Sequence, residues 1–159
     1  MTLPHAPILG SRTLHWPDEA ACAGFAAGLA RRPALREACL ALDGDLGAGK
    51  TTFVRYLLQA LGVPGRIKSP SYTVLEPYAL PGLAVSHFDF YRFDDPHEWE
   101  DAGFREVFAA PGLKLVEWPQ KAGALLPRPD LWLHITVQGE TQREVTLQAL
   151  TPRGLELLP

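Results

Sequence analysis

Residues 44–51 read GDLGAGKT and lie between a short apolar run and an amphipathic segment. The eight residues match the pattern GxxxxGK[ST], in which glycines let backbone N–H groups surround phosphate oxygens without side-chain obstruction. An apolar strand before the motif and a helix after it are the context that supports this interpretation. The stretch therefore predicts a phosphate-binding loop at the end of a buried strand.

The residues on either side of the motif have the patterns of that strand and helix. Residues 38–42 form a short apolar run, as expected of a buried strand. Apolar side chains at one-turn intervals from Phe53 to Leu61 predict a helix. Gly62 and Pro64 then end it. The positive end of this helix's dipole would point at a bound phosphate.

The rest of the chain alternates between strand and helix patterns. Strands are expected at 11–16, 73–78, 83–88 and 113–116, helices after Pro17 and within 94–108, and an antiparallel hairpin at 131–137 and 145–150. The expected fold is α/β, a three-layer P-loop NTPase-like arrangement with a mixed, mainly parallel central sheet and an antiparallel hairpin near the C-terminus.

Length and composition predict one soluble domain over residues 1–159. No apolar run approaches the roughly 18 residues of a membrane span, and the first ten residues lack the pattern of a secretory signal. Cys22 and Cys39 have no metal-ligand spacing, which favours free thiols in a reducing cytoplasm. The net charge of -3 disfavours a protein that clamps nucleic acid by itself.

The motif assigns roles to individual residues of an ATP and magnesium site. Lys50 is expected to neutralise the β- and γ-phosphates, and Thr51 to offer its hydroxyl to Mg²⁺. The residues expected to contact ATP are Asp45, Leu46, Gly47, Ala48, Gly49, Lys50, Thr51 and Thr52.

Two carboxylates follow predicted strands and are candidates to complete the site. Asp89 ends the strand at 83–88, and Glu117 ends the strand at 113–116. Both would emerge beside the loop if these strands run parallel to the first. Asp89 is expected to hold the metal through its water shell, while Glu117 orients or deprotonates the attacking water. The reverse assignment is also chemically permissible.

The segment Ser69-Pro70-Ser71-Tyr72-Thr73 has two open interpretations. Its hydroxyls occupy the place where nucleotide switches sense the γ-phosphate, and Thr73 is the preferred sensor. A Ser/Pro turn that leads into an edge strand explains the same residues.

Several other residues are weaker candidates. Lys68 and Arg92 have the charge to contact phosphate, but unpaired surface cations are common. Trp118 suits either stacking on a ligand or a place in the core. His87 shows no metal-ligand spacing toward the other histidines.

Four ordered blocks of the chain resemble the TsaE family (formerly YjeE), the small bacterial ATPases of tRNA threonylcarbamoyladenosine biosynthesis. The blocks are GDLGAGKTTFVRYLLQALG at 44–62, KSPSYTVLEPY at 68–78, HFDFYRF at 87–93 and LVEWP at 115–119. The family commonly has SPTYT where this chain has Ser71. Ser71 retains the hydroxyl and lacks the methyl group of threonine.

The resemblance implies roles for the residues already singled out. Lys50 and Thr51 would bind phosphate and magnesium, and Thr73 would lie in a switch-like segment. Asp89 and Glu117 would carry metal binding and hydrolysis.

The resemblance also implies partners. The family binds the TsaB–TsaD pair and couples ATP hydrolysis to repeated turnover of that pair, so tRNA would be met only indirectly. The ATPase would be weak alone and stimulated by its partners. The acidic net charge agrees with a protein that acts on a partner and leaves tRNA to it.

Three other functions fit a phosphate-binding loop in a short chain. A small P-loop kinase usually has an arginine-rich lid, whereas the segment 94–106 is acidic and contains only Arg105 as a cation. A guanine-nucleotide switch lacks support because the chain has no NKxD sequence. A nucleotide-gated binding module with negligible turnover is compatible with the sequence.

Overall fold

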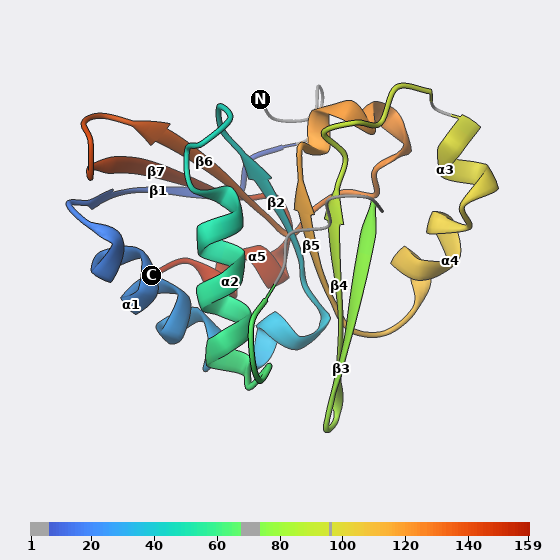
Figure 1. Ribbon diagram of the computed structural model, residues 1–159, viewed down its shortest axis with the longest axis horizontal. Helices are drawn as coiled ribbons and strands as arrows, with labels where there is room; N and C mark the ends of the chain where they lie inside the picture. The colour runs from blue at the N-terminus through green and yellow to red at the C-terminus, as the bar shows by residue number, and fades with distance from the viewer. Residues whose placement is uncertain (1–6, 68–73, 96) are drawn as a thin grey trace.

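The computed structural model describes residues 7–67, 74–95 and 97–159, which form one mixed β-sheet flanked by helices (Figure 1). In chain order the elements are β1 (Gly10–Trp16), α1 (Glu19–Ala30), η1 (Pro33–Glu37), β2 (Cys39–Asp43), α2 (Lys50–Leu61), β3 (Leu75–Leu80), β4 (Leu83–Asp89), α3 (His97–Asp101), α4 (Phe104–Ala109), β5 (Leu113–Glu117), η2 (Pro119–Lys121), η3 (Gly123–Leu125), β6 (Leu131–Val137), β7 (Arg143–Ala149) and α5 (Pro152–Leu157), where η marks a 3₁₀ helix. No helix within these ranges combines the length and the apolar character of a membrane span.

The sheet has the strand order β1-β7-β6-β2-β5-β4-β3. Its four central strands β6, β2, β5 and β4 run parallel, whereas β1, β7 and β3 pair antiparallel at the two sides. The mixed sheet and the β6–β7 hairpin confirm the α/β fold expected from the sequence. Because the central strands are parallel, their carboxyl ends share one edge of the sheet.

The two faces of the sheet bury different side chains because successive strand residues point to opposite faces. On β5, Leu113 and Leu115 belong to a large apolar cluster that includes residues of α1 and α2, whereas Val116 belongs to a second cluster. The second cluster is largely aromatic, and within it Phe88 of β4 stacks on Phe108 of α4 with ring centroids 4.5 Å apart. Helices therefore cover both faces, which gives the three expected layers.

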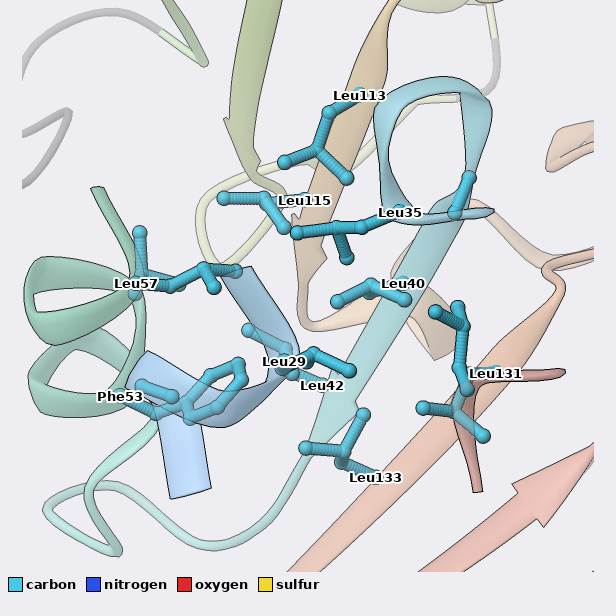
Figure 2. Packing of buried hydrophobic residues seen from close by; sticks show 14 of the residues in the cluster. Leu29, Leu35, Leu40, Leu42, Phe53, Leu57, Leu113, Leu115, Leu131 and Leu133 are labelled. Atoms are coloured by element: carbon cyan, nitrogen blue, oxygen red, sulfur yellow. The ribbon is translucent and has the colours of Figure 1, made fainter. Parts of the chain in front are cut away.

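Figure 2 shows the large cluster, in which side chains of the central strands lie beside those of α1 and α2. Leu40 and Leu42 of β2 are fully buried there, as are Phe53 and Leu57 of α2. Burying one such side chain contributes about 1.5–3 kcal/mol to stability. This packing fixes β2 against α2 and so holds both ends of the loop between them.

The ends of the two long helices follow from local sequence. Asp18 is the N-cap of α1, and its side chain accepts a hydrogen bond from the backbone N of Ala21 at 3.0 Å. Gly62 ends α2 with a φ of +106° and donates its N–H to the carbonyl of Gln59. Both ends agree with the boundaries predicted from the sequence.

Helix α5 has no counterpart among the predicted elements. It is six residues long, and it contains Gly154, which is unfavourable in a helix interior. Thr151 nevertheless caps it by accepting a hydrogen bond from the N of Gly154 at 3.0 Å. A Cβ on Gly154 would lie 1.9 Å from the carbonyl oxygen of Asp130, so the glycine permits close packing on the sheet. The hydrophobic periodicity of the sequence does not predict this tertiary contact.

Gly112→Ala should lower the free energy of unfolding by about 3 kcal/mol or more. Gly112 has a φ of +125°, and a Cβ there would lie 2.4 Å from the carbonyl oxygen of Ala84. Gly62→Ala is the matched control, since φ is +106° but its added Cβ would meet no described residue within 4 Å beyond its immediate chain neighbours. Backbone strain alone should cost the control about 1–2 kcal/mol. Urea unfolding followed by circular dichroism measures both, and equal losses would contradict the proposed clash.

Candidate nucleotide-binding site

The glycine-rich motif 44–51 comprises the loop that joins β2 to α2, at the carboxyl edge of the central strands, and the first two residues of α2. Gly44 packs closely against β6, because a Cβ on it would lie 2.6 Å from the carbonyl oxygen of Ile135. Gly47 and Gly49 have φ values of +83° and +113°, which residues with a Cβ rarely adopt. Close packing and backbone conformation thus account for glycine at these positions.

Lys50 is the first residue of α2, and its side chain is 4% exposed. Its Nζ donates hydrogen bonds to the backbone carbonyl oxygens of Gly44 and Asp45, the latter at 3.1 Å. Burial lowers the pKa of this ammonium group, and the nearby Glu117 carboxylate is the main opposing influence. The loop therefore holds a desolvated cation where its electrostatic attraction to a bound phosphate would be strongest.

Trp118 borders the same space in a rare backbone conformation. Its φ of +57° is the one positive value among the non-glycine residues that the structure describes. The indole ring lies 4.2 Å from Lys50 Nζ, measured to the ring centroid, and 5.0 Å from the ring of Tyr91. Strained backbone of this kind concentrates at functional sites. Trp118 is thus both partly packed against the aromatic cluster and positioned at the site.

Glu117 ends β5 and is 2% exposed. Its Oε1 accepts a hydrogen bond from Thr51 Oγ1 at 2.8 Å. Its Oε2 lies 2.6 Å from Nε2 of His87, which is 1% exposed. The carboxylate is therefore attached to the loop through one oxygen and to β4 through the other.

Asp89 ends β4 and lies directly opposite Glu117 in the parallel β4–β5 register. Its Oδ1 accepts a hydrogen bond from the backbone N of Tyr91 at 3.0 Å. Burial raises the pKa of Asp89, and the neighbouring Glu117 raises it further. The two carboxylates thus meet at the predicted edge of the sheet.

A cavity of about 260 Å³ occupies the space between the loop and these carboxylates. Its lining residues are Leu46, Gly47, Gly49, Lys50, Thr51, Thr52, Asp89, Tyr91, Glu117 and Trp118. A second cavity of about 200 Å³ adjoins the other side of the loop and is bounded by α1 and the β6–β7 hairpin. Ala48 faces this second cavity, with Trp16, Glu19 and Arg143.

Some predicted residues do not line either cavity or fall outside the description. The carbonyl of Asp45 accepts hydrogen bonds from the N of Ala48 at 2.9 Å and from Lys50, so Asp45 helps to shape the loop. Thr73 and Lys68 lie outside the described residues. Arg92 is exposed.

Two contacts of the site are not evident from the sequence. His87 has no metal-ligand spacing, although strand alternation places it on the same face as Asp89, two residues later. Arg143 of β7 donates from Nε to the carbonyl oxygen of Ala48 at 2.8 Å. The Arg143 contact depends on the position of β7 in the sheet, so no local sequence pattern predicts it.

The oxygen donors of the site fit a magnesium ion shared with a nucleotide. Thr51 Oγ1 and the carboxylates of Glu117 and Asp89 surround the cavity beside the loop. Mg²⁺ prefers oxygen ligands, keeps several waters and binds through one or two carboxylates together with substrate phosphates. The cradle formed by the glycines and Lys50 is correspondingly suited to phosphate.

Comparison with known proteins agrees with this geometry. A family model described as "Threonylcarbamoyl adenosine biosynthesis protein TsaE" matches residues 16–145. The tRNA threonylcarbamoyladenosine biosynthesis protein TsaE of Haemophilus influenzae is 41% identical over 117 residues, which cover 74% of this chain and 73% of that protein. The protein of the same name from Bacillus subtilis is 40% identical over 114 residues, covering 72% and 71%.

A solved structure has the same fold. The crystal structure of Bacillus subtilis YdiB superimposes with a TM-score of 0.76 at 30% sequence identity, covering 93% of this chain and 91% of that chain. The family model spans the loop, both carboxylates and the strands that carry them. The chain therefore belongs to the TsaE family.

Proposed function

We propose that this protein binds ATP with Mg²⁺ and hydrolyses it in the cytoplasm as the ATPase component of tRNA threonylcarbamoyladenosine modification. The observation that carries the proposal is the arrangement of Lys50 and Thr51 at the start of α2 with the buried carboxylate of Glu117. Membership of the TsaE family indicates that the pathway is tRNA threonylcarbamoyladenosine biosynthesis. The partners, by resemblance, are TsaB and TsaD homologues, and tRNA is met only through them.

Phosphate binding follows from the loop and from Lys50. Backbone N–H groups of the loop and the start of α2 provide partial positive charge, and Lys50 adds a full charge. Lys50 already lies at the cavity, so little rearrangement is needed for it to meet the β- and γ-phosphates. The second cavity, on the other side of the loop, is the proposed place of the ribose and base.

The contacts of Glu117 support the reverse of the division of labour preferred from the sequence. Because Thr51 Oγ1 donates to Glu117, the threonine hydroxyl and this carboxylate lie next to each other beside the loop. We assign Glu117 to the water shell of the metal and Asp89 to orienting and deprotonating the attacking water. Magnesium, when bound, would neutralise charge on the phosphate oxygens. The raised pKa of Asp89 agrees with a general base.

The experiment that tests the function is phosphate release from ATP, measured with and without the TsaB–TsaD pair. We expect weak release alone and a clear increase when both partners are present. A pull-down against the pair, with ATP or ADP, should show retention that depends on the nucleotide. Phosphate transfer to a small hydroxyl acceptor would instead indicate a kinase. Binding without release under any condition would indicate a nucleotide-gated module.

A further inference from the structure

His87 is a buried polar residue that lines neither cavity. Its side chain is 1% exposed and lies on β4 between strand neighbours that contribute to the apolar core, such as Val85 and Leu115. Nε2 contacts Oε2 of Glu117 at 2.6 Å, whereas Nδ1 has no hydrogen-bond partner among the described residues. Burying an unpartnered polar atom costs stability, so an apolar residue would suit this position better if packing were its only role.

The sheet register explains why the histidine reaches this carboxylate. His87 pairs with Leu115 on β5, and two residues further along both strands Asp89 pairs with Glu117. Residues two apart on a strand point to the same face. The imidazole therefore lies one step deeper in the sheet than the two carboxylates, with Nε2 directed at Glu117.

The two oxygens of Glu117 have different partners, and this fixes the carboxylate. Oε1 accepts from Thr51 at 2.8 Å, and Oε2 is held by His87. The terminal torsion of a glutamate side chain is broad, so one hydrogen bond alone leaves the carboxylate plane poorly defined. The Lys50 ammonium lies close enough to interact electrostatically with Glu117. Without His87, the carboxylate is free to turn toward that cation.

We propose that His87 is a positioning residue that donates from Nε2 to Glu117 and thereby keeps Oε1 aligned with Thr51 for metal-nucleotide binding. This inference rests on the proposed ATPase function. His87 is not among the residues that line the cavity, so it acts through Glu117, which does line it and which it contacts. Groups that orient metal-site ligands in this way typically change metal affinity or activity by about 10–100-fold when removed.

The test compares His87→Leu with His87→Gln. Leucine removes the donor, whereas glutamine places an amide nitrogen the same number of bonds from the backbone as Nε2. In His87→Leu the magnesium concentration for half-maximal phosphate release should rise about 10-fold or more. ATP affinity measured by calorimetry in the presence of a chelator should stay within about twofold. His87→Gln should recover most of the loss, and equal impairment of both variants would exclude positioning by a donor.

A double-mutant cycle and a measurement without ligand complete the test. In a Glu117→Gln background, His87→Leu should add little further loss, whereas fully additive effects would show that His87 acts elsewhere. In the nucleotide-free wild type, nitrogen-proton NMR should show a proton on Nε2 of His87 that is protected from solvent. A neutral ring with its proton on Nδ1 would refute the proposal. Because this measurement uses the nucleotide-free protein, it tests the role of His87 even if the wild type binds no ATP. A failure of the ATPase proposal can therefore be told apart from a failure of the His87 proposal.

Discussion

Lys50→Ala should abolish ATP binding at concentrations that saturate the wild type. Among the residues that the structure describes, the lysine is the one side-chain cation that lines the cavity beside the loop, and its charge is largely desolvated. Hydrogen bonds to charged groups contribute about 1.5–3 kcal/mol each, so loss of contacts to two phosphates corresponds to at least about 100-fold in affinity. Isothermal titration with ATP and Mg²⁺ measures this loss directly.

Lys121→Ala is the matched control for Lys50→Ala because it removes the same charge from an exposed position in η2. Its dissociation constant for ATP should match that of the wild type within about twofold, since exposed charges are screened by salt. Circular dichroism must show that the Lys50 variant is folded, because Lys50 also donates to two loop carbonyls. If a folded Lys50→Ala protein has a dissociation constant for ATP within threefold of that of the wild type, the lysine does not contribute to ATP binding.

The parts of this structure that the sequence predicts are those with local causes. The glycine motif, the start of α1 after Pro17 and the left-handed Gly62 each depend on residues within one or two turns. The positions of Asp89 and Glu117 required one further assumption, that their strands are parallel to β2. The register of β4, β5 and β2 confirms that assumption. Local pattern and one topological rule thus bring both carboxylates to the loop.

The contacts that sequence reasoning missed depend on residues far apart in the chain. Arg143 reaches the loop from β7, 95 residues away from Ala48. Gly154 allows α5 to pack on the carbonyl of Asp130, a contact that periodicity does not encode. His87 shows a different limit. Its role is defined by a partner on the neighbouring strand, so a search for metal-ligand spacing along the chain could not find it.

The division of labour between the two carboxylates predicts different kinetic consequences for Glu117→Gln and Asp89→Asn. Glutamine keeps the size of Glu117 but removes the charge beside Thr51. The magnesium requirement, which is the magnesium concentration for half-maximal phosphate release, should therefore rise about 10–100-fold. ATP binding in the presence of a chelator should remain. Asparagine at position 89 removes the proposed base, so the turnover number should fall about 100–10,000-fold with the magnesium requirement little changed.

Both variants should be compared with neutralised carboxylates outside the cavity. Asp94 and Glu156 are exposed, and Asp94→Asn and Glu156→Gln should leave both the turnover number and the magnesium requirement unchanged. Phosphate release at a series of magnesium concentrations separates the two kinetic parameters for every variant. If Asp89→Asn raises the magnesium requirement while Glu117→Gln lowers only turnover, Asp89 lies by the metal and Glu117 is the base. In that case the bond from Thr51 to Glu117 must break when the nucleotide binds, because the hydroxyl turns to the metal and the carboxylate to the attacking water.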